Sequence, residues 1–253
     1  NTVTANMAIM ILINCLFSFN LSKILRLSLL TLKPLKIAVN INAANDTILT
    51  NLSWDNNNTT KLFAGEFIAQ TELSSNENFD TLITNTTILP TELILQNKSW
   101  IIDQSSIWSD FNKIIVENFK IHSNDDQLIA INGIASKNQK DTIDIQLKDI
   151  SLNYIDELLP EETEISFGGI VNGNASIANT LILPEITADV ISENFFFDGS
   201  YFGTAVATCN FDHSTTSLRF DGTVIADNND TTAILSGNYF IPNDSLDIKG
   251  KAY

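Results

Sequence analysis

The chain has few cysteines and few basic residues. Its 253 residues include two cysteines, Cys15 and Cys209, which lie in unrelated parts of the sequence and do not make a disulfide framework. We expect each to act as a small apolar side chain. Lysine and arginine total 14 against 30 acidic residues, and Arg219 is the one basic residue between Asp149 and Ile248. Because phosphate groups are bound by Lys and Arg, this charge balance argues against a nucleic-acid partner and against an anionic membrane surface for this half.

Motifs of catalysis are also missing. The two histidines, His122 and His213, have no set of Cys, His or carboxylate residues near them at metal-ligand spacing. No Gly-x-Ser-x-Gly elbow, Walker loop or dinucleotide-binding glycine pattern is present. Glu161, Glu162 and Glu164 are typical of a solvated charge run, whereas glycosidase carboxylates face each other across a cleft. The sequence therefore predicts no enzyme, no metal and no cofactor.

No apolar run reaches the length of a membrane span. The run over residues 7–19 is interrupted by Asn14 and followed by Lys23, and it falls short of the roughly twenty residues that a span needs. It has neither the basic residues before it nor the small-residue cleavage site after it that mark a secretory signal. The sequence begins without methionine, so we expect any export signal or membrane anchor to lie upstream of Asn1.

What the chain does contain is the two-residue periodicity of β-strands. Apolar and polar side chains alternate in short segments that are rich in β-branched residues. These segments are residues 37–41, 62–64, 67–69, 93–95, 143–147, 218–220, 224–226 and 246–248. Clusters of Asn, Asp, Ser and Gly, which favour tight turns, separate them. The pattern predicts an all-β fold, a meander of antiparallel strands with one apolar face and one polar face.

Helical patterns are few. Asn20 can cap a helix over residues 21–32, which carry apolar side chains on one face. Residues 153–159 repeat this pattern in miniature, with Pro160 as the stop. A third candidate helical turn covers residues 105–112. We expect the first two helices to be short plugs that close one end of a strand module.

One part of the strand pattern occurs twice. Trp54, an Asp, a polar tip and Gly65 recur as Phe211, an Asp, a polar tip and Gly222, with the Gly eleven positions after the aromatic residue in both copies. A missing side chain in mid-strand lets a sheet bend, so each copy predicts a turn and a curl. Repeated strand modules extend a surface rather than hold one active site. The duplication therefore predicts one section of a longer curved sheet.

The strand and turn segments follow one another in a specific order. They are residues 100–103, 115–129, 133–136, 141–147 and 150–153, then Gly168-Gly169, Asn172-Gly173, Pro184, Gly203, Phe211-Asp212 and Gly237. In this order they resemble the β-strand repeat region of the TamB-like translocation and assembly module family, within the AsmA-like group. The similarity covers most of residues 34–253. The resemblance implies an elongated, curled antiparallel sheet, a U-shaped β-groove with an apolar interior and one or two short helices.

The resemblance also implies a place and a function. A protein of this family is tethered at the inner membrane, crosses the periplasm toward the outer membrane, moves phospholipid between the two and contributes to outer-membrane assembly. The implied partners are phospholipid acyl chains. An outer-membrane barrel partner would be reached through a C-terminal segment that has no counterpart in these residues.

Three parts of one continuous sheet follow from these patterns. Residues 1–33 are a short helical or linker segment ending a preceding module, residues 34–132 are one β-repeat module, and residues 133–253 are a second, incomplete one. Residues 195–197 are candidates for a constriction or a cover. The residues expected to line the groove are Ile37, Val39, Ile143, Ile145, Leu147, Leu218, Phe220, Val224, Leu246 and Ile248.

Two other functions are compatible with an alternating sheet. In a structural or adhesive β-repeat protein, the apolar faces pack on each other and no ligand is bound. In a folding platform, nascent outer-membrane strands are received by pairing with a free sheet edge. An alternating sheet must cover its apolar face, and few amphipathic helices are available to do so. A second sheet, closure of the sheet or a ligand therefore has to cover it.

Overall fold

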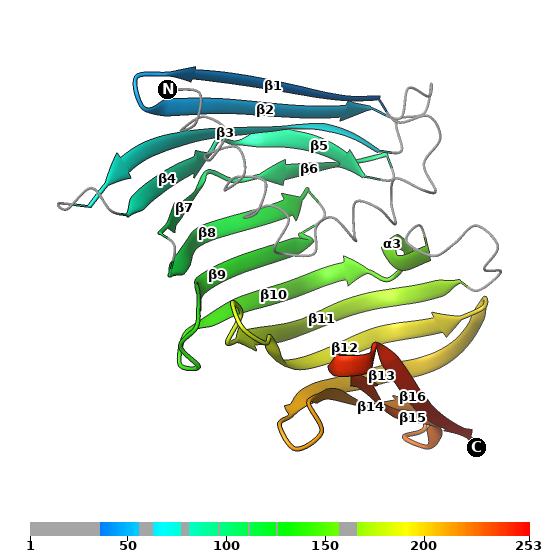
Figure 1. Cartoon of the computed structure of the whole chain (residues 1–253). Helices are drawn as coiled ribbons and strands as arrows, with labels where there is room; N and C mark the ends of the chain where they lie inside the picture. Colours follow the sequence, from blue (N-terminus) through cyan, green and yellow to red (C-terminus); the bar gives the residue numbers. More distant parts are fainter. Residues whose placement is uncertain are drawn as a thin grey trace.

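The structure, a computed structural model, describes residues 36–55, 63–76, 81–95, 97–110, 112–124, 126–156 and 166–253. Sixteen strands form one sheet (Figure 1). They are β1 (Lys36–Ala44), β2 (Thr47–Asp55), β3 (Phe63–Ser75), β4 (Leu82–Ile88), β5 (Thr91–Leu95), β6 (Lys98–Ile102), β7 (Ser105–Ser109), β8 (Lys113–Ser123), β9 (Leu128–Ser136), β10 (Thr142–Ser151), β11 (Phe167–Ala178), β12 (Glu185–Phe197), β13 (Ser200–Asp212), β14 (Ser217–Ile225), β15 (Thr231–Phe240) and β16 (Ser245–Ala252). The described helical segments are α3 (Asn153–Asp156) and the 3-10 turn η1 (Ile241–Asn243). Within the described ranges, no helix has the length and apolarity to cross a membrane.

Every strand pairs antiparallel with its neighbours, nearly always in chain order. Two positions in the sheet are each filled by two short strands. β4 and β5 lie end to end beside β3, and β6 and β7 lie end to end beside β8. Pro90 falls in the break between β4 and β5, where its lack of an N–H ends the ladder. The predicted all-β antiparallel fold is confirmed, while the U-shaped curl stays a prediction.

The sheet is strongly twisted. In Figure 1 the strands descend from β1 at the top to β14 and β15 at the bottom, and their directions turn along the way, so that the red β16 slopes steeply across the view while β1 is nearly level. Two tight hairpins have both central residues in the left-handed region, Asn45-Asp46 between β1 and β2 and Asp198-Gly199 between β12 and β13. Such turns match the right-handed twist of the strands they join.

Bulges interrupt alternate strands in the middle of the sheet. β8, β10 and β12 each carry an Asn or Asp with positive φ at the register shift: Asn118 at 56°, Asp149 at 53° and Asn194 at 49°. Short polar side chains tolerate this conformation because they bond locally. In β8, the Asn118 amide donates to Asn132 Oδ1 on β9 at 2.6 Å. A bulge adds a residue to one strand, bends it and increases the local twist.

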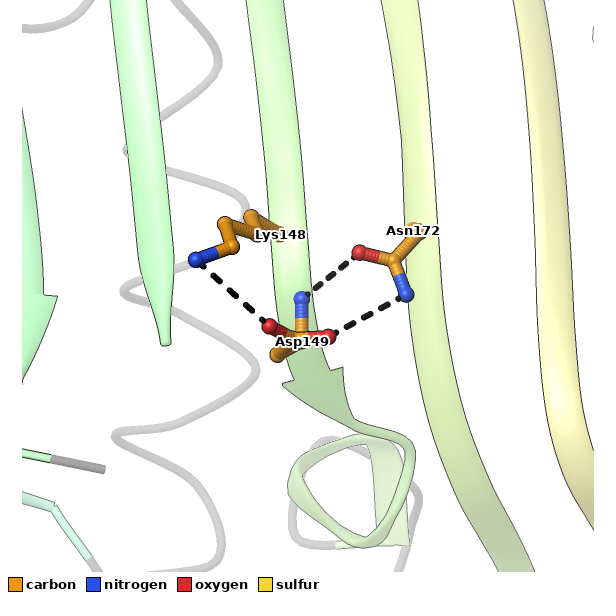
Figure 2. Close-up of polar contacts among 3 residues, drawn as sticks. All are labelled: Lys148, Asp149 and Asn172. Atoms are coloured by element: carbon orange, nitrogen blue, oxygen red, sulfur yellow. Dashed lines mark hydrogen bonds and ion pairs between the residues drawn. The ribbon is translucent and has the colours of Figure 1, made fainter. Parts of the chain in front are cut away.

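The bulge of β10 is held from the neighbouring strand (Figure 2). The Asp149 amide donates to Asn172 Oδ1 on β11 at 2.9 Å, and Asn172 Nδ2 donates back to Asp149 Oδ1 at 3.3 Å. Lys148 Nζ lies 3.8 Å from the other carboxylate oxygen of Asp149. One asparagine therefore satisfies a backbone donor that the bulge takes out of the ladder.

Some local predictions need correction. The helical turn predicted for residues 105–112 is wrong, because Ser105–Ser109 is the strand β7, in which Ile107 pairs with Thr86 and with Val116. The segments 62–64 and 67–69 belong to the single strand β3 as far as described, and 218–220 and 224–226 to β14. The helix predicted over 153–159 is described as α3, four residues long.

Two other predictions concern the ends of the modules. The helix predicted over residues 21–32, like the whole segment 1–33, lies outside the described residues. The predicted module boundary after residue 132 falls inside β9, and the sheet continues through that strand.

Candidate functional site: the apolar face of the sheet

One face of the sheet is predominantly apolar from the first strand to the last, with hydroxyl side chains between the apolar ones at β3, β4 and β7. Cross-strand partners form rows, and residues of one row point to the same face. One row crosses β1 to β12 through Ala43, Ile48, Thr71, Thr86, Ile107, Val116, Gly133, Ile143, Ile177 and Ile186. A second crosses β9 to β16 through Ile131, Ile145, Ala175, Ala188, Cys209, Phe220, Gly237 and Ile248. Because Ile143 and Ile145 are two positions apart in β10, both rows lie on one face, called here the apolar face.

All of the residues predicted to line a groove lie on the apolar face. Alternation along each strand places them there together with the two rows: Ile37, Val39, Ile143, Ile145, Leu147, Leu218, Phe220, Val224, Leu246 and Ile248. They come from β1, from β10, and from β14 and β16, which both pair with β15. The register thus places these residues on one surface of the sheet. That they contact lipid stays a prediction.

The apolar face is buried in the middle of the sheet and exposed at both ends. Ile143 is fully buried and packs with Ile114, Val116 and Ala135 in the hydrophobic core, against which Ile145 also lies. The turn after β11 reaches across to β9, where the Leu181 amide donates to the Ser136 carbonyl at 3.4 Å. The exposed fraction of the side chains rises to 56% at Val39 in β1 and at Leu246 in β16.

The C-terminal half of the apolar face is lined by small side chains. Rows across β11 to β16 contain Gly173, Ala175, Ala188, Ala205, Ala207, Gly222, Ala233, Gly237, Gly250 and Ala252. Among them stand larger residues such as Leu235, which is 45% exposed, and Ile248, which is 50% exposed. Alanine and glycine leave a shallow, smooth surface between these side chains.

Aromatic side chains pack over glycines on the apolar face. A Cβ placed on Gly65 would lie 2.7 Å from Trp54 Cζ2, and one placed on Gly237 would lie 2.4 Å from Phe220 Cζ. Trp54 is the cross-strand partner of Gly65, but Phe211, its counterpart in the second copy of the repeat, pairs with Leu218 instead. The two copies therefore share sequence spacing and differ in register.

The aromatic segment 195–197 ends β12, beside the Asp198-Gly199 turn. Its rings pair with those of neighbouring strands, Phe197 with Phe167 at 5.6 Å between centroids and Phe196 with Tyr201 at 5.2 Å. The side chains of Phe196 and Phe197 are each 38% exposed. The segment thus forms an aromatic cluster at the end of a hairpin, and its predicted action as constriction or cover stays a prediction.

The opposite face is the more polar one and carries cross-strand hydrogen bonds, although Ile191, Val206 and Ile234 share a row there and are each exposed by 37–40%. Ser176 Oγ donates to Asp144 Oδ1 at 2.8 Å, and Ser106 Oγ donates to Glu117 Oε2 at 2.9 Å. His122 Nε2 lies 3.2 Å from Asp103 Oδ1. In the part of the chain that the structure describes, no three His, Cys, Asp or Glu side chains come together as a metal site.

Cys209 lies in the second row of the apolar face, between Ala188 and Phe220. Burial raises the pKa of its thiol above the usual value. This position agrees with the expectation that the cysteine acts as a small apolar side chain.

The sequence patterns did not single out a group of polar atoms on the apolar face. Thr50, Trp54, Thr91, Trp100 and Ser105 each hold a buried side-chain N or O atom with no hydrogen-bond partner among the described residues. The sequence did contain one indication of these residues, because Thr50 and Trp54 occupy positions in β2 at which the alternation places side chains on the apolar face.

Comparison of the chain with protein-family models, with curated proteins and with solved structures found no match.

Proposed function

We propose that this chain is a section of a lipid-transfer protein, and that acyl chains of phospholipids lie on the apolar face and move along it from strand to strand. The observation that carries the proposal is the continuity of the apolar face across all fourteen strand positions of the sheet. Described helical segments are limited to seven residues in α3 and η1, so they cover little of this face.

The chemistry of the face suits an acyl chain. Each strand position is about 4.8 Å wide, which leaves room for about three methylenes of a chain that crosses the strands. Burial of one methylene stabilises by about 0.8 kcal/mol, so each strand crossed contributes about 2 kcal/mol. At the exposed ends of the sheet, neighbouring strands offer similar apolar rows, so an acyl chain exchanges one contact for an equivalent one as it moves. In the middle it has to displace whatever buries Ile88 and Ile143.

The cellular setting in this proposal is the periplasm, with lipid moving between the inner and outer membranes in support of outer-membrane assembly. That setting, the inner-membrane anchor and a barrel partner rest on the resemblance to TamB-like proteins, and not on any side chain of the apolar face. The acidic charge agrees with a groove that binds the acyl chains and leaves the headgroups in water.

A structural β-repeat protein with a dry core is the second candidate. It is favoured by the burial of the middle of the face, where Ile88 and Trp100 are each 2% exposed. A third candidate, the edge-pairing platform, is favoured by β1, whose nine residues are all exposed. These candidates differ from the first in what they bind: a dry core binds no lipid, and a platform forms crosslinks from its edge strands to client barrels.

The test is a lipid-binding and transfer measurement on the purified chain and on an Ile248→Asp variant. Ile145 is less suitable because it packs against the core, whereas Ile248 is 50% exposed at the end of the same row. A carboxylate at position 248 removes about 2 kcal/mol of acyl contact and must itself be desolvated. We expect lipid affinity and transfer from phosphatidylcholine vesicles to fall at least about 30-fold.

The matched control is Ser236→Asp. Ser236 is on the polar face, where it is the cross-strand partner of Lys249, so the variant adds the same charge on the other side of the sheet. Transfer by this control should equal that of the unmodified chain. Native mass spectrometry that finds no phospholipid on the chain, or transfer that survives Ile248→Asp unchanged, would refute the proposal.

A further inference from the structure

Five polar side chains lie on the apolar face of β2 to β7 with a buried atom that has no hydrogen-bond partner among the described residues. The atoms are Thr50 Oγ1, Trp54 Nε1, Thr91 Oγ1, Trp100 Nε1 and Ser105 Oγ. Three of these residues are more than nine-tenths buried: Trp100 is 2% exposed, Thr50 5% and Ser105 5%. Buried polar groups in native proteins are nearly always paired, and an unpaired one calls for a reason such as an absent ligand.

The register brings these atoms into one patch. Thr50, Ala69, Ile88 and Ser105 form one row across β2, β3, β4 and β7. Trp54, Gly65, Leu93 and Trp100 form another across β2, β3, β5 and β6. Between these rows lie the pairs Leu52 with Phe67 and Thr91 with Ile102. With strands about 4.8 Å apart, the set spans on the order of 15 Å, and we call it the donor patch.

Gly65 shapes the middle of the donor patch. A Cβ at this position would lie 2.7 Å from Trp54 Cζ2 and 2.7 Å from Leu93 Cβ, so the indole of Trp54 lies across the glycine toward β5. The ring of Trp100 is fixed by an edge contact with Tyr154 of α3 at 5.8 Å between centroids. Tyr154 itself donates to Gln127 Oε1 at 3.0 Å, and the indole N–H of Trp100 has no hydrogen-bond partner among the described residues.

The chemistry of the donor patch selects its ligand. An indole N–H only donates, and a hydroxyl can donate, so the complement is a group with several acceptor oxygens. None of the residues in these rows is charged, and Lys98, the nearest cation on this face of β6, is exposed two residues from Trp100. A buried anion such as a phosphate or a carboxylate would need a cationic partner inside the patch. The remaining acceptors are neutral carbonyl oxygens joined to long aliphatic chains.

We infer that the donor patch binds the ester carbonyl oxygens of a diacyl glycerolipid, whose acyl chains continue along the apolar face. This inference rests on the proposed function and adds a site at which the lipid pauses in one orientation. The ester region lies against Trp54, Trp100 and the hydroxyls, and the headgroup stays outside the patch.

The test compares ester-linked dioleoyl phosphatidylcholine with its ether-linked dialkyl analogue, which keeps the headgroup and chain length and lacks the carbonyl oxygens. Two recovered hydrogen bonds, at about 1 kcal/mol each, correspond to about a 30-fold tighter binding of the ester lipid to the unmodified chain. In the double variant Trp100→Phe with Ser105→Ala, the ratio of ester-lipid to ether-lipid affinity should fall to within about twofold, because the hydrogen bonds that are lost were made only to the ester lipid. The control is Trp108→Phe with Ser106→Ala, the corresponding change on the polar face of β7, which should keep the preference.

Stability without lipid gives a second readout. Thr50→Val and Ser105→Ala each remove an unpaired hydroxyl at little change in volume, so we expect neither to lower the thermal midpoint of the lipid-free chain. A loss of stability in both would show that the hydroxyls have partners and would overturn the inference.

The outcomes separate this inference from the proposed function. Equal binding of the ester and ether lipids overturns the donor patch and leaves the lipid-transfer proposal in place. Tighter binding of free oleate than of the ester lipid also overturns it, because an anion would then be the preferred ligand. Absence of binding to any of these lipids overturns both.

Discussion

Replacement of Gly237 by alanine tests how closely β14, β15 and β16 are packed. A Cβ at this position would lie 2.4 Å from the carbonyl oxygen of Asp247 in β16 and 2.4 Å from Cζ of Phe220 in β14. The phenyl ring can turn aside, but the carbonyl belongs to the backbone of the adjacent strand. The added methyl therefore has to displace β16, whose residue Ile248 is the cross-strand partner of Gly237.

The expected cost follows from two opposing effects. Overpacking of a tightly packed site costs about 1–3 kcal/mol. Alanine also restricts the backbone of the unfolded chain, which stabilises the folded state by about 0.4–1 kcal/mol. The net result is a destabilisation of about 1–2 kcal/mol. Gly222 is the matched control, since the nearest atom to its Cβ would be Leu235 Cβ at 3.7 Å, an ordinary contact. Gly222→Ala should stabilise the chain by about 0.4–1 kcal/mol.

Urea unfolding measures the change in stability of each variant, and amide hydrogen exchange shows which strands it affects. Gly237→Ala should lower the urea midpoint and speed exchange in β15 and β16 by about tenfold, while β8 to β10 keep the rates of the unmodified chain. Gly222→Ala should raise the midpoint. Equal midpoints for the two variants, or unchanged exchange in β16, would refute the packing argument at Gly237.

Two further predictions concern burial and pH. Ile143→Ala, at a fully buried site, should cost about 3 kcal/mol in urea unfolding, whereas Ile248→Ala, at a half-exposed site, should cost less than about 1 kcal/mol; similar costs would contradict the burial difference along the apolar face. Hydrogen bonds donated by the hydroxyl and the amide of Ser214 lower the pKa of Asp212. Their stabilising effect on the hairpin between β13 and β14 is present above the ordinary pKa of about 3.9 and is lost as the pH falls through the lowered value. The Ser214 amide should therefore exchange faster, relative to its intrinsic rate, on acidification, and Asp212→Asn should abolish this dependence.

The alternation of side chains was enough to predict the fold class and the apolar face. In β10 the pattern of Ile143, Ile145 and Leu147 separates the two faces without knowledge of the partners, because side chains alternate along any strand. The predictions for β1 and β16 agree with the register for the same reason. The order of the strands was also accessible, since short turns favour pairing between consecutive strands.

Register and local breaks were not accessible from the sequence. The pattern of residues 105–112 imitates a helical turn, but β7 forms because its two neighbours offer cross-strand partners, which no local pattern records. The pairing of Trp54 with Gly65 depends on the length of the connection between β2 and β3, so equal spacing in the second copy led to a different pairing. The unpaired atoms of the donor patch became visible only when burial and partners were known.

The bulges described in β8, β10 and β12 have a consequence for how the sheet finds its alignment. A two-residue repeat of apolar side chains looks the same after a slip of two positions, so hydrophobic burial alone leaves many alignments of nearly equal free energy. The pair formed by Asp149 and Asn172 exists in one of these alignments only, because a slip would separate the Asn172 amide from the backbone N–H it accepts from. Each bulge thus fixes the register of its strand and selects one alignment of a long, repetitive sheet.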